Sequence, residues 1–291
     1  MTNHYKYLIL MMMAVLGSSP LFAQKGTNRT EPPKLPSKGI CAHRGAVEKH
    51  PENTIAAFKE AIRLGAQMIE FDVRLSKDKQ LVIMHDTLVD RTTNGSGYLH
   101  EMTLRELKKL DAGSWKSIQF KGEKIPTLQE VLEIMPDSIW LNIHLKGGKK
   151  LGRKTAKLIV AEKRLHQAIL ACEKDAAKKV RKVNAAIKMC NMERSSSRQK
   201  YIDETLAERF AFIQLKKSRE NDSLAIDIAR LKKNGVHINY VQAETPNHML
   251  QLLDQGIDFV LTDHLTLLLD AFSNNNQSYS SQNKNSTLNP Q

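Results

Sequence analysis

The chain has 291 residues and a formal net charge of +13, while aromatic residues make up only 5% of it. The positive charge would suit nucleic-acid binding, but the lysines are dispersed over the expected helices and no aromatic base-stacking surface is evident. We therefore expect no nucleic-acid partner and interpret the lysines as solvated helix faces. Their field can still attract anionic substrates or lipid headgroups, which leaves peripheral membrane contact open.

Residues 1–23 have the composition of a secretory signal peptide. Lys6 precedes an apolar run at residues 7–16, and small residues lead to Ala23. The run is too short to span a bilayer as a mature anchor. We expect cleavage after Ala23 and an exported protein, periplasmic or secreted, with an uncleaved anchor as the alternative.

Three further segments follow the signal. Residues 24–38 contain prolines and lysines and are interpreted as a linker. Residues 273–291 are almost entirely Ser, Asn and Gln, and such a tail buries too little apolar surface to offset the entropy of ordering, so we expect it to be disordered. The segment between them, residues 39–272, is close to the usual length of one (β/α)8 barrel, about 250 residues.

The barrel segment opens with a strand at residues 39–43, a helix at 55–64 and strands at 68–75 and 81–85. Residues 87–126 then break the pattern with turns and one helix at 103–110, which has a capping box at Thr103 and Glu106. We interpret this stretch as a small insertion after the second barrel strand. A helix at 128–134 follows it.

Beyond this helix, strands and helices alternate. Alternation of this kind predicts parallel strands joined by right-handed crossovers. We therefore predict an α/β protein with a TIM (β/α)8 barrel. The expected strands are residues 139–145, 168–172, 186–191, 210–215, 236–241 and 259–262, and the expected helices are 149–163, 175–183, 198–208, 224–233, 246–254 and 265–272.

Polar side chains gather where the expected strands end. His43, Asp72, His85, His144 and Lys146 all fall at or just beyond such an end. In TIM barrels the chemistry occurs at the carboxyl ends of the strands. The positions of these residues therefore agree with the predicted fold.

Glu70 and Asp72 are two residues apart on one expected strand, so their side chains project from the same face. An inward-facing pair repels unless a cation neutralises it, which suggests Ca²⁺ or Mg²⁺ held by oxygen ligands. An outward-facing pair would instead bind helix lysines. The apolar neighbours Ile69 and Phe71 favour the inward placement.

His43 and His85 together offer a base that activates a nucleophile and an acid that protonates a leaving oxygen. Each alone could equally satisfy a loop carbonyl. Arg44 is a candidate phosphate clamp, and its alternative role is an ion pair with Glu52 or Asp86. Glu52 is either a helix-entry residue or a ligand of metal or substrate.

The ordered motifs together resemble the glycerophosphodiester phosphodiesterase family. The resemblance implies a TIM barrel, a divalent metal, and hydrolysis of glycerophosphodiesters to glycerol 3-phosphate and an alcohol, through attack that can begin with the substrate's own glycerol hydroxyl. It makes His43 and His85 the histidine pair and Glu70 and Asp72 the first two metal carboxylates, and Lys146 matches the family's lysine. The motifs are His43-Arg44-Gly45, Pro51-Glu52-Asn53-Thr54, Glu70-Phe71-Asp72, His85-Asp86, Arg91-Thr92-Thr93-Asn94-Gly95, Leu110-Asp111-Ala112-Gly113 and Leu261-Thr262-Asp263.

The chain departs from this family pattern at two places. His144 stands where the family usually has a third metal glutamate, and imidazole suits Zn²⁺ or Mn²⁺ better than Ca²⁺. Either the metal preference differs, or Glu52 or Glu244 supplies the missing oxygen. Residues 241–244 replace an aromatic stretch that usually lines the family's substrate pocket, so we expect altered recognition of the glycerol moiety, and the exact diester stays open.

We therefore expect an exported, metal-dependent phosphodiesterase that acts on small-molecule glycerophosphodiesters by histidine acid-base catalysis. Two alternatives remain, a related enzyme acting on a lysophospholipid or glycosyl phosphodiester, and a noncatalytic barrel that binds phosphate ligands. The expected site residues are His43 and His85 for catalysis, Arg44, Lys146 and Glu52 for substrate phosphate, and Glu70, Asp72 and His144 for the metal.

Overall fold

The computed structural model describes residues 34–193, 197–243 and 245–286, with the side chains of 276–286 excluded. The expected signal peptide, most of the expected linker and the candidate ligand Glu244 lie outside these residues. None of the helices in the described ranges is both long and apolar enough to cross a membrane.

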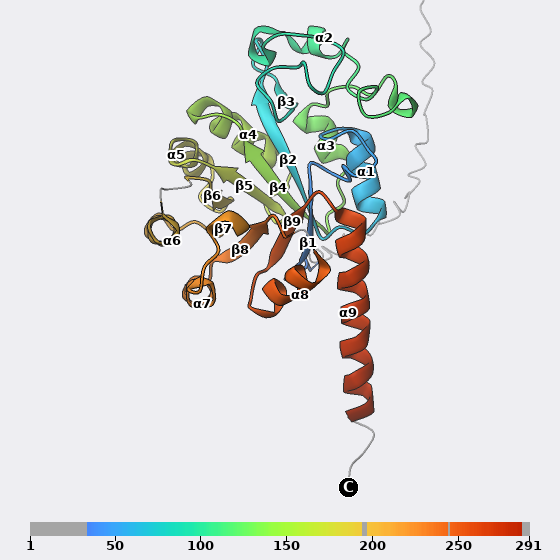
Figure 1. Cartoon of the computed structure of the whole chain (residues 1–291). Coiled ribbons are helices and arrows are strands. Elements are labelled where there is room, and N and C mark those ends of the chain that lie inside the picture. Colours follow the sequence, from blue (N-terminus) through green and yellow to red (C-terminus); the bar gives the residue numbers. More distant parts are fainter. Residues whose placement is uncertain (1–33, 194–196, 244, 287–291) are drawn as a thin grey trace, which may run out of the picture. The chain divides into compact units, whose positions relative to one another are not determined.

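Eight parallel strands close into a barrel (Figure 1), so the predicted TIM-barrel fold is confirmed. The strands follow the order β1-β2-β4-β5-β6-β7-β8-β9, and β9 returns to pair with β1. They are β1 (Gly39–His43), β2 (Met68–Leu75), β4 (Trp140–Leu145), β5 (Ala168–Cys172), β6 (Lys188–Asn191), β7 (Phe212–Lys216), β8 (His237–Val241) and β9 (Phe259–Thr262).

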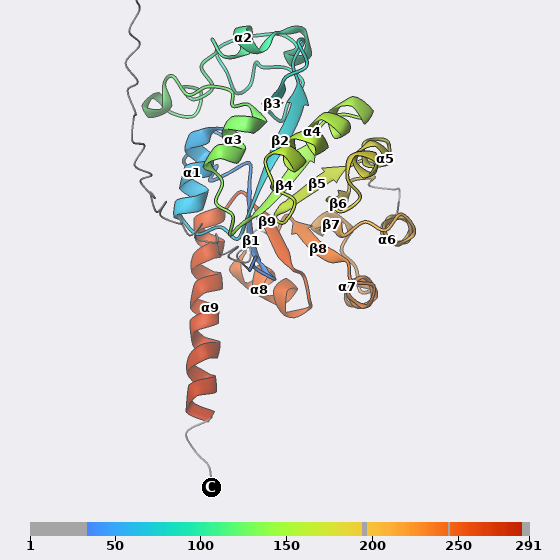
Figure 2. The same ribbon diagram turned by 180° about the vertical axis from the view of Figure 1, so that it is seen from behind.

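Helices follow the barrel strands and surround them, as Figures 1 and 2 show from opposite sides. They begin at capped positions where the sequence offers a hydroxyl, such as Thr54, whose side chain accepts a hydrogen bond from the backbone N–H of Ala57. The helices are α1 (Ile55–Arg63), α3 (Leu128–Ile134), α4 (Lys149–Ala161), α5 (Lys174–Val183), α6 (Arg198–Ala207), α7 (Leu224–Lys233), α8 (Pro246–Asp254) and α9 (Leu265–Ser286).

The strand predicted at residues 81–85 does not belong to the barrel. It is β3 (Leu81–Ile83), which pairs antiparallel with the end of β2. Between β3 and α3 the chain forms η1 (Leu99–Glu101), α2 (Leu104–Leu107) and η2 (Ile118–Phe120). The capping box of Thr103 and Glu106 is present at α2, although the helix is shorter than predicted. This segment has a small apolar core of its own, separate from that of the barrel.

The C-terminal helix differs most from the expectation. We predicted that it ends at Phe272, but α9 continues to Ser286, so residues 273–286, which we assigned to the disordered tail, belong to a helix. The shorter prediction rested on the polar composition of residues 273–291, which offers little apolar surface to bury. The sequence from Leu265 to Ser286 contains neither Gly nor Pro, so no residue in it interrupts the backbone hydrogen bonds.

The barrel interior is apolar at the amino ends of the strands. Met68, Trp140, Phe212 and Phe259 are buried there in one cluster, and Leu35 packs against it. The indole N–H of Trp140 donates a hydrogen bond of 2.8 Å to the carbonyl oxygen of Pro36, so the last residues of the expected linker contact this end of the barrel. Packed side chains fill this end, and the polar residues gather at the opposite one.

Candidate active site

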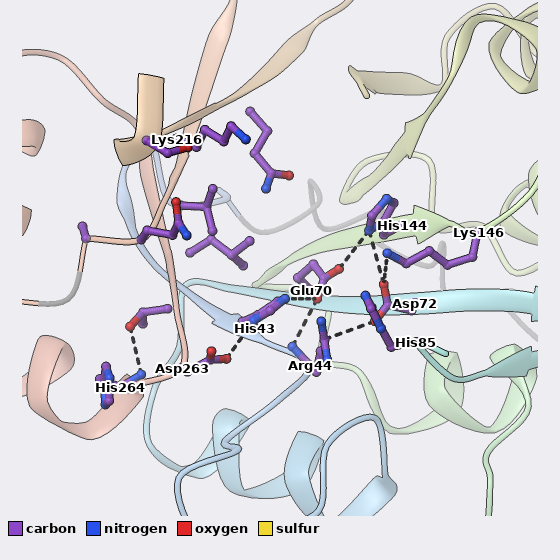
Figure 3. Close-up of a pocket in the computed structure, with 17 residues that line it drawn as sticks. His43, Arg44, Glu70, Asp72, His85, His144, Lys146, Lys216, Asp263 and His264 are labelled. Carbon is purple, nitrogen blue, oxygen red and sulfur yellow. Dashed lines mark hydrogen bonds and ion pairs between the residues drawn. The ribbon is translucent and has the colours of Figure 1, made fainter. Parts of the chain in front are cut away.

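A pocket of about 450 Å³ opens at the carboxyl ends of the strands. Most of the residues selected from the sequence line it and point toward one another in Figure 3. They come from separate elements, and the strand pairing explains their proximity, since β1 aligns His43 with Glu70 and β2 aligns Asp72 with His144. The predicted residues that line the pocket are His43, Arg44, Glu70, Asp72, His85, His144 and Lys146.

His43 is held by a residue from the far end of the chain. Its Nδ1 lies 2.7 Å from Oδ1 of Asp263, and its Nε2 lies 4.0 Å from Oε2 of Glu70. Burial lowers the pKa of His43, but the Asp263 hydrogen bond and the Glu70 charge outweigh burial and raise it above its ordinary value. A protonated His43 is therefore favoured. Our selection from the sequence did not include Asp263, although it directly follows an expected strand end.

His85 has a similar arrangement with a neighbour in sequence. Its Nδ1 lies 2.6 Å from Oδ1 of Asp86, and its carbonyl oxygen accepts a hydrogen bond of 2.9 Å from Nε of Arg74. Burial lowers the pKa of His85, and the charges of Arg44 and Lys146 act in the same direction. The two histidines thus differ, since the surroundings favour a protonated His43 and a neutral His85.

Asp86 is held in turn by Arg91. Nε of Arg91 lies 2.6 Å from Oδ2 of Asp86, and its two terminal nitrogens each lie 2.8 Å from an oxygen of Glu52. The hydrogen bond from Arg91 lowers the pKa of Asp86 to about 2. Asp86 is therefore a fixed negative charge that orients the His85 ring. Arg91 was part of a sequence motif but received no role from it.

Glu70, Asp72 and His144 form a compact set of ligand atoms. One ligand atom from each residue lies within 4.8 Å of the other two. Glu70 and Asp72 are only 3% and 1% exposed, and Nδ1 of His144 lies 3.6 Å from Oε1 of Glu70 and 3.2 Å from Oδ1 of Asp72. The inward face of β2 thus brings two buried carboxylates beside an imidazole.

Asp72 carries a negative charge in this setting. Burial alone would raise its pKa, but His144, Lys146 and Arg44 lower it far below the ordinary value. Nδ1 of His144 and Nζ of Lys146 each lie 3.2 Å from its buried Oδ1. A buried, charged carboxylate beside a second carboxylate and an imidazole fits a divalent cation. The donor set therefore fits the implied metal.

The loop after β1 contains two consecutive residues with positive φ, Arg44 and Gly45. Arg44 has a φ of 58°, and its N–H donates a hydrogen bond of 3.2 Å to Oε2 of Glu70. Gly45 follows with a φ of +92°, and a Cβ on it would lie 2.7 Å from the side chain of Ala57 in α1. Glycine therefore allows the loop to pass close to the helix and direct the Arg44 amide at Glu70.

Asn53 is a site residue that the sequence analysis missed. It has a φ of 57°, which Asn tolerates better than most residues. Its Nδ2 donates a hydrogen bond of 3.0 Å to Oδ2 of Asp72, and its Oδ1 accepts one of 3.2 Å from the Asp72 N–H. Asn53 thus fixes the orientation of the Asp72 carboxylate.

Glu52, which we expected to bind substrate phosphate, does not line the pocket. Its Oε1 accepts a hydrogen bond of 2.9 Å from Arg44, and Arg91 binds both of its oxygens. Glu52 is also absent from the metal-ligand set found in the described residues. Two arginines occupy its carboxylate, so the ion pair with Arg44 that we considered as an alternative is present.

The opposite wall of the pocket comes from β7, β8 and the loops that follow them. Gln214, Lys216 and Gln242 line it, and Gln242 adopts a φ of 73°. Figure 3 shows Lys216 across the pocket from Lys146. We did not select Lys216 from the sequence, although its place at a strand end is the signal that led to Lys146. Val241 and Ala243 line the pocket where we expected the usual aromatic wall to be missing.

Comparisons with known proteins identify the family of this chain. The model of the glycerophosphoryl diester phosphodiesterase family matches residues 43–267. A glycerophosphodiester phosphodiesterase from Caldanaerobacter subterraneus subsp. tengcongensis is 56% identical over 110 residues, which are 38% of this chain and 45% of that protein. The chain spans less than half the length of the curated relatives it matches.

Solved structures resemble the chain over a longer range. A phosphodiesterase from Oleispira antarctica, solved with the product sn-glycerol-3-phosphate, matches with a TM-score of 0.72 and 28% identity, covering 81% of this chain and 96% of that one. A glycerophosphodiester phosphodiesterase from Agrobacterium tumefaciens matches with a TM-score of 0.70 and 25% identity, covering 80% and 99% of the two chains.

Proposed function

Because this chain belongs to the glycerophosphoryl diester phosphodiesterase family, we propose that it hydrolyses small glycerophosphodiesters to glycerol 3-phosphate and an alcohol. The observation that carries the proposal is the pair of histidines at the pocket, each with Nδ1 beside an aspartate oxygen, at 2.7 Å for His43 and 2.6 Å for His85. This contact fixes the ring and leaves Nε2 for proton transfer.

In the proposed reaction, one histidine removes the proton of the substrate's glycerol hydroxyl as its oxygen bonds to phosphorus. The other histidine protonates the alcohol oxygen as its bond to phosphorus breaks, and water then opens the cyclic phosphate to glycerol 3-phosphate. Proton transfers of this kind contribute about 10²–10⁴-fold each to the rate. The raised pKa of His43 and the lowered pKa of His85 support a division of the acid and base roles between them.

We propose that Arg44 and Lys146 bind the substrate phosphate. Both line the pocket and both lie beside Asp72, with Nε of Arg44 3.5 Å and Nζ of Lys146 3.2 Å from its oxygens. Fixed positive charges near a phosphate stabilise the negative charge that builds up during attack. Glu52 contributes indirectly in this proposal, because its ion pair with Arg44 orients the guanidinium.

We also propose that Glu70, Asp72 and His144 hold a divalent cation. Bound there, such an ion would act as a Lewis acid toward the phosphate. Two carboxylates suit Ca²⁺ or Mg²⁺, whereas the imidazole favours Mn²⁺ or Zn²⁺.

We also propose that the protein is exported from the cytoplasm. It rests on the charged start, the apolar run and the small residues of positions 1–23. Expression of the full chain with fractionation of the cells tests it. A cleaved protein outside the cytoplasm is expected, and an uncleaved protein in the cytosol contradicts export.

A matrix of metals and substrates on the purified protein tests the activity. Glycerophosphocholine, a lysophospholipid and a glycosyl phosphodiester are offered with Ca²⁺, Mg²⁺, Mn²⁺ or Zn²⁺. The phosphomonoester released from each is measured, which is glycerol 3-phosphate in the case of glycerophosphocholine. This choice of readout follows the product bound to the Oleispira antarctica relative. His43→Ala and His85→Ala should each lower turnover by at least about 100-fold while the fold remains intact. Binding without turnover under every metal would instead favour a noncatalytic barrel.

A further inference from the structure

A second cavity, of about 440 Å³, adjoins the catalytic pocket, and Lys146 lines both. It lies between the end of β2, the chain around η1 and the start of α4. Its basic residues are Arg74, His100, Lys146, Lys149 and Lys150, and no Asp or Glu of the described part of the chain lines it. We call it the lysine cavity after these residues.

Lys146 pairs with Asp72 at 3.2 Å, but little of the remaining positive charge is compensated locally. Lys150 is exposed and has no ion-pair partner within the described ranges. Lys149 lies 3.3 Å from Asp175, but the two side chains are 60% and 61% exposed, so water screens that pair. Arg74 donates its hydrogen bonds to the carbonyl oxygen of His85, which leaves its formal charge in place. The cavity therefore presents a positive potential to a ligand.

The remaining surface of the cavity is suited to close contact. Leu75, Leu99 and Leu151 supply apolar surface. Gly147 and Gly148 border it without side chains, and a Cβ on Gly148 would meet no atom within 4 Å. A ligand can thus approach the backbone at the start of α4, where the helix dipole adds to the attraction of an anion.

A third cavity, on the other side of Lys146, serves as a contrast. It shares Arg74, Lys146 and the two glycines with the lysine cavity and adds Lys174 and Lys200, but Glu173, Glu193 and Glu204 also line it. These three carboxylates offset much of the attraction for an anion, and Glu204 already pairs with Lys174. Of the two spaces that adjoin the catalytic pocket through Lys146, the lysine cavity is the one suited to negative charge.

We propose that the lysine cavity binds the alcohol half of the substrate and selects alcohols that carry an additional anionic group, such as a phosphate monoester. The inference rests on the proposed phosphodiesterase activity. The scissile phosphate occupies the catalytic pocket beside Lys146, and the leaving alcohol extends past Lys146 toward Lys149 and Lys150. The positive charge of the cavity then discriminates between otherwise equal diesters.

Two diesters that differ by one phosphate test the inference, glycerophosphoinositol and glycerophosphoinositol 4-phosphate. The wild-type protein should hydrolyse the phosphorylated diester with a kcat/KM about tenfold higher at low salt, and this ratio should fall as NaCl is added. Lys149→Ala/Lys150→Ala should bring the ratio close to one, chiefly by lowering the kcat/KM of the phosphorylated diester. An unchanged ratio in this variant contradicts the inference.

Lys178→Ala/Lys233→Ala is the matched control. It removes the same charge from exposed positions on α5 and α7 that line neither cavity, so it should keep the wild-type ratio. Equal loss in both double variants would mean that net charge, and not the cavity, sets the preference.

Calorimetric binding separates the inference from the activity on which it rests. His43→Ala is titrated with each diester, with and without the Lys149/Lys150 substitutions. In one outcome, the wild-type protein shows no turnover while binding still prefers the phosphorylated diester and loses this preference with the two lysines. That result would overturn the proposed function but retain the subsite. Turnover of both diesters without any preference in rate or binding would retain the function and overturn the subsite.

Discussion

Nδ1 of His43 lies 2.7 Å from Oδ1 of Asp263, and this contact links the first barrel strand to the last. His43 ends β1 and Asp263 directly follows β9, and these two strands pair where the barrel closes. The corresponding contact of His85 is made to Asp86, its neighbour in sequence. The orientation of one histidine therefore depends on barrel closure, while that of the other depends on a single loop.

Asp263→Asn should lower kcat by about one to two orders of magnitude with a small effect on KM. The amide keeps the shape of the carboxylate but removes the charge that selects the tautomer of His43 and stabilises its protonated form. Steady-state kinetics measures the effect. On a His43→Ala background the same substitution should cause no further loss, and Asp270→Asn, which alters an exposed residue of α9, is the control. A further loss in the double variant would mean that Asp263 acts independently of His43.

Arg91 should affect catalysis more than stability. It joins Glu52 to Asp86 and thereby supports His85, but its side chain is 45% exposed. We expect Arg91→Ala to reduce kcat by about tenfold, because residues that orient the partner of a functional side chain commonly contribute about 10–100-fold to activity. The exposed ion pairs contribute little to folding, so the free energy of unfolding should fall by less than about 1 kcal/mol. Kinetics and urea unfolding measure the two effects.

Arg63→Ala provides the control for Arg91. Arg63 also binds a glutamate through two nitrogens, with both distances to Glu60 at 2.6 Å, but the pair lies on an exposed face of α1 away from the pocket. Its loss should leave kcat unchanged. Equal kinetic effects in the two variants would show that Arg91 has no special connection to His85.

The metal preference should follow residue 144. His144→Glu restores the carboxylate that the family usually has, and a third oxygen ligand favours Ca²⁺ and Mg²⁺ over Mn²⁺ and Zn²⁺. Calorimetry should show tighter Ca²⁺ binding and weaker Zn²⁺ binding than in the wild-type protein, and activity after chelation should be restored by a different ion. His166→Glu, outside the pocket, is the control. Unchanged affinities would place the metal elsewhere.

The fold and the central residues were predictable because their signals are local. Buried strands appear as short apolar runs, and the two-residue spacing of Glu70 and Asp72 places both on the inner face of β2. The end of α9 was not predictable in this way. A polar composition suggested a tail, but the segment holds no Gly or Pro to interrupt the helix.

The contacts that orient the site residues could not be predicted from the sequence, because they join positions far apart in the chain. Asp263 lies 220 residues from His43 and Arg91 lies 39 from Glu52, so their contacts depend on how the barrel closes and how the loop after β3 folds back. Glu52 illustrates the same limit. Its position in a motif beside Arg44 suited a ligand of substrate or metal. Arg91, from that distant loop, instead binds both oxygens of the Glu52 carboxylate.

Asp258 should make the stability of the barrel depend on pH in acid. It is 6% exposed, and its oxygens lie 2.7 Å from the Ile238 N–H and 2.6 Å from Nζ of Lys232. Burial raises the pKa of Asp258, but His237, Lys232 and the Ile238 amide outweigh burial and lower it below its ordinary value. The charged form is therefore bound more favourably in the folded state, and its stabilisation is complete above the unfolded pKa of about 3.9.

Asp258→Asn should lower the free energy of unfolding by about 1–3 kcal/mol near neutral pH, because a buried hydrogen bond to a charged group is weakened. The difference between wild-type protein and variant should stay constant down to about pH 5 and shrink as the pH falls below about 4, where the wild-type carboxylate takes up its proton. Urea unfolding of both proteins across this range measures it, and taking the difference cancels the titration of the other carboxylates. A difference that grows on acidification would contradict the lowered pKa.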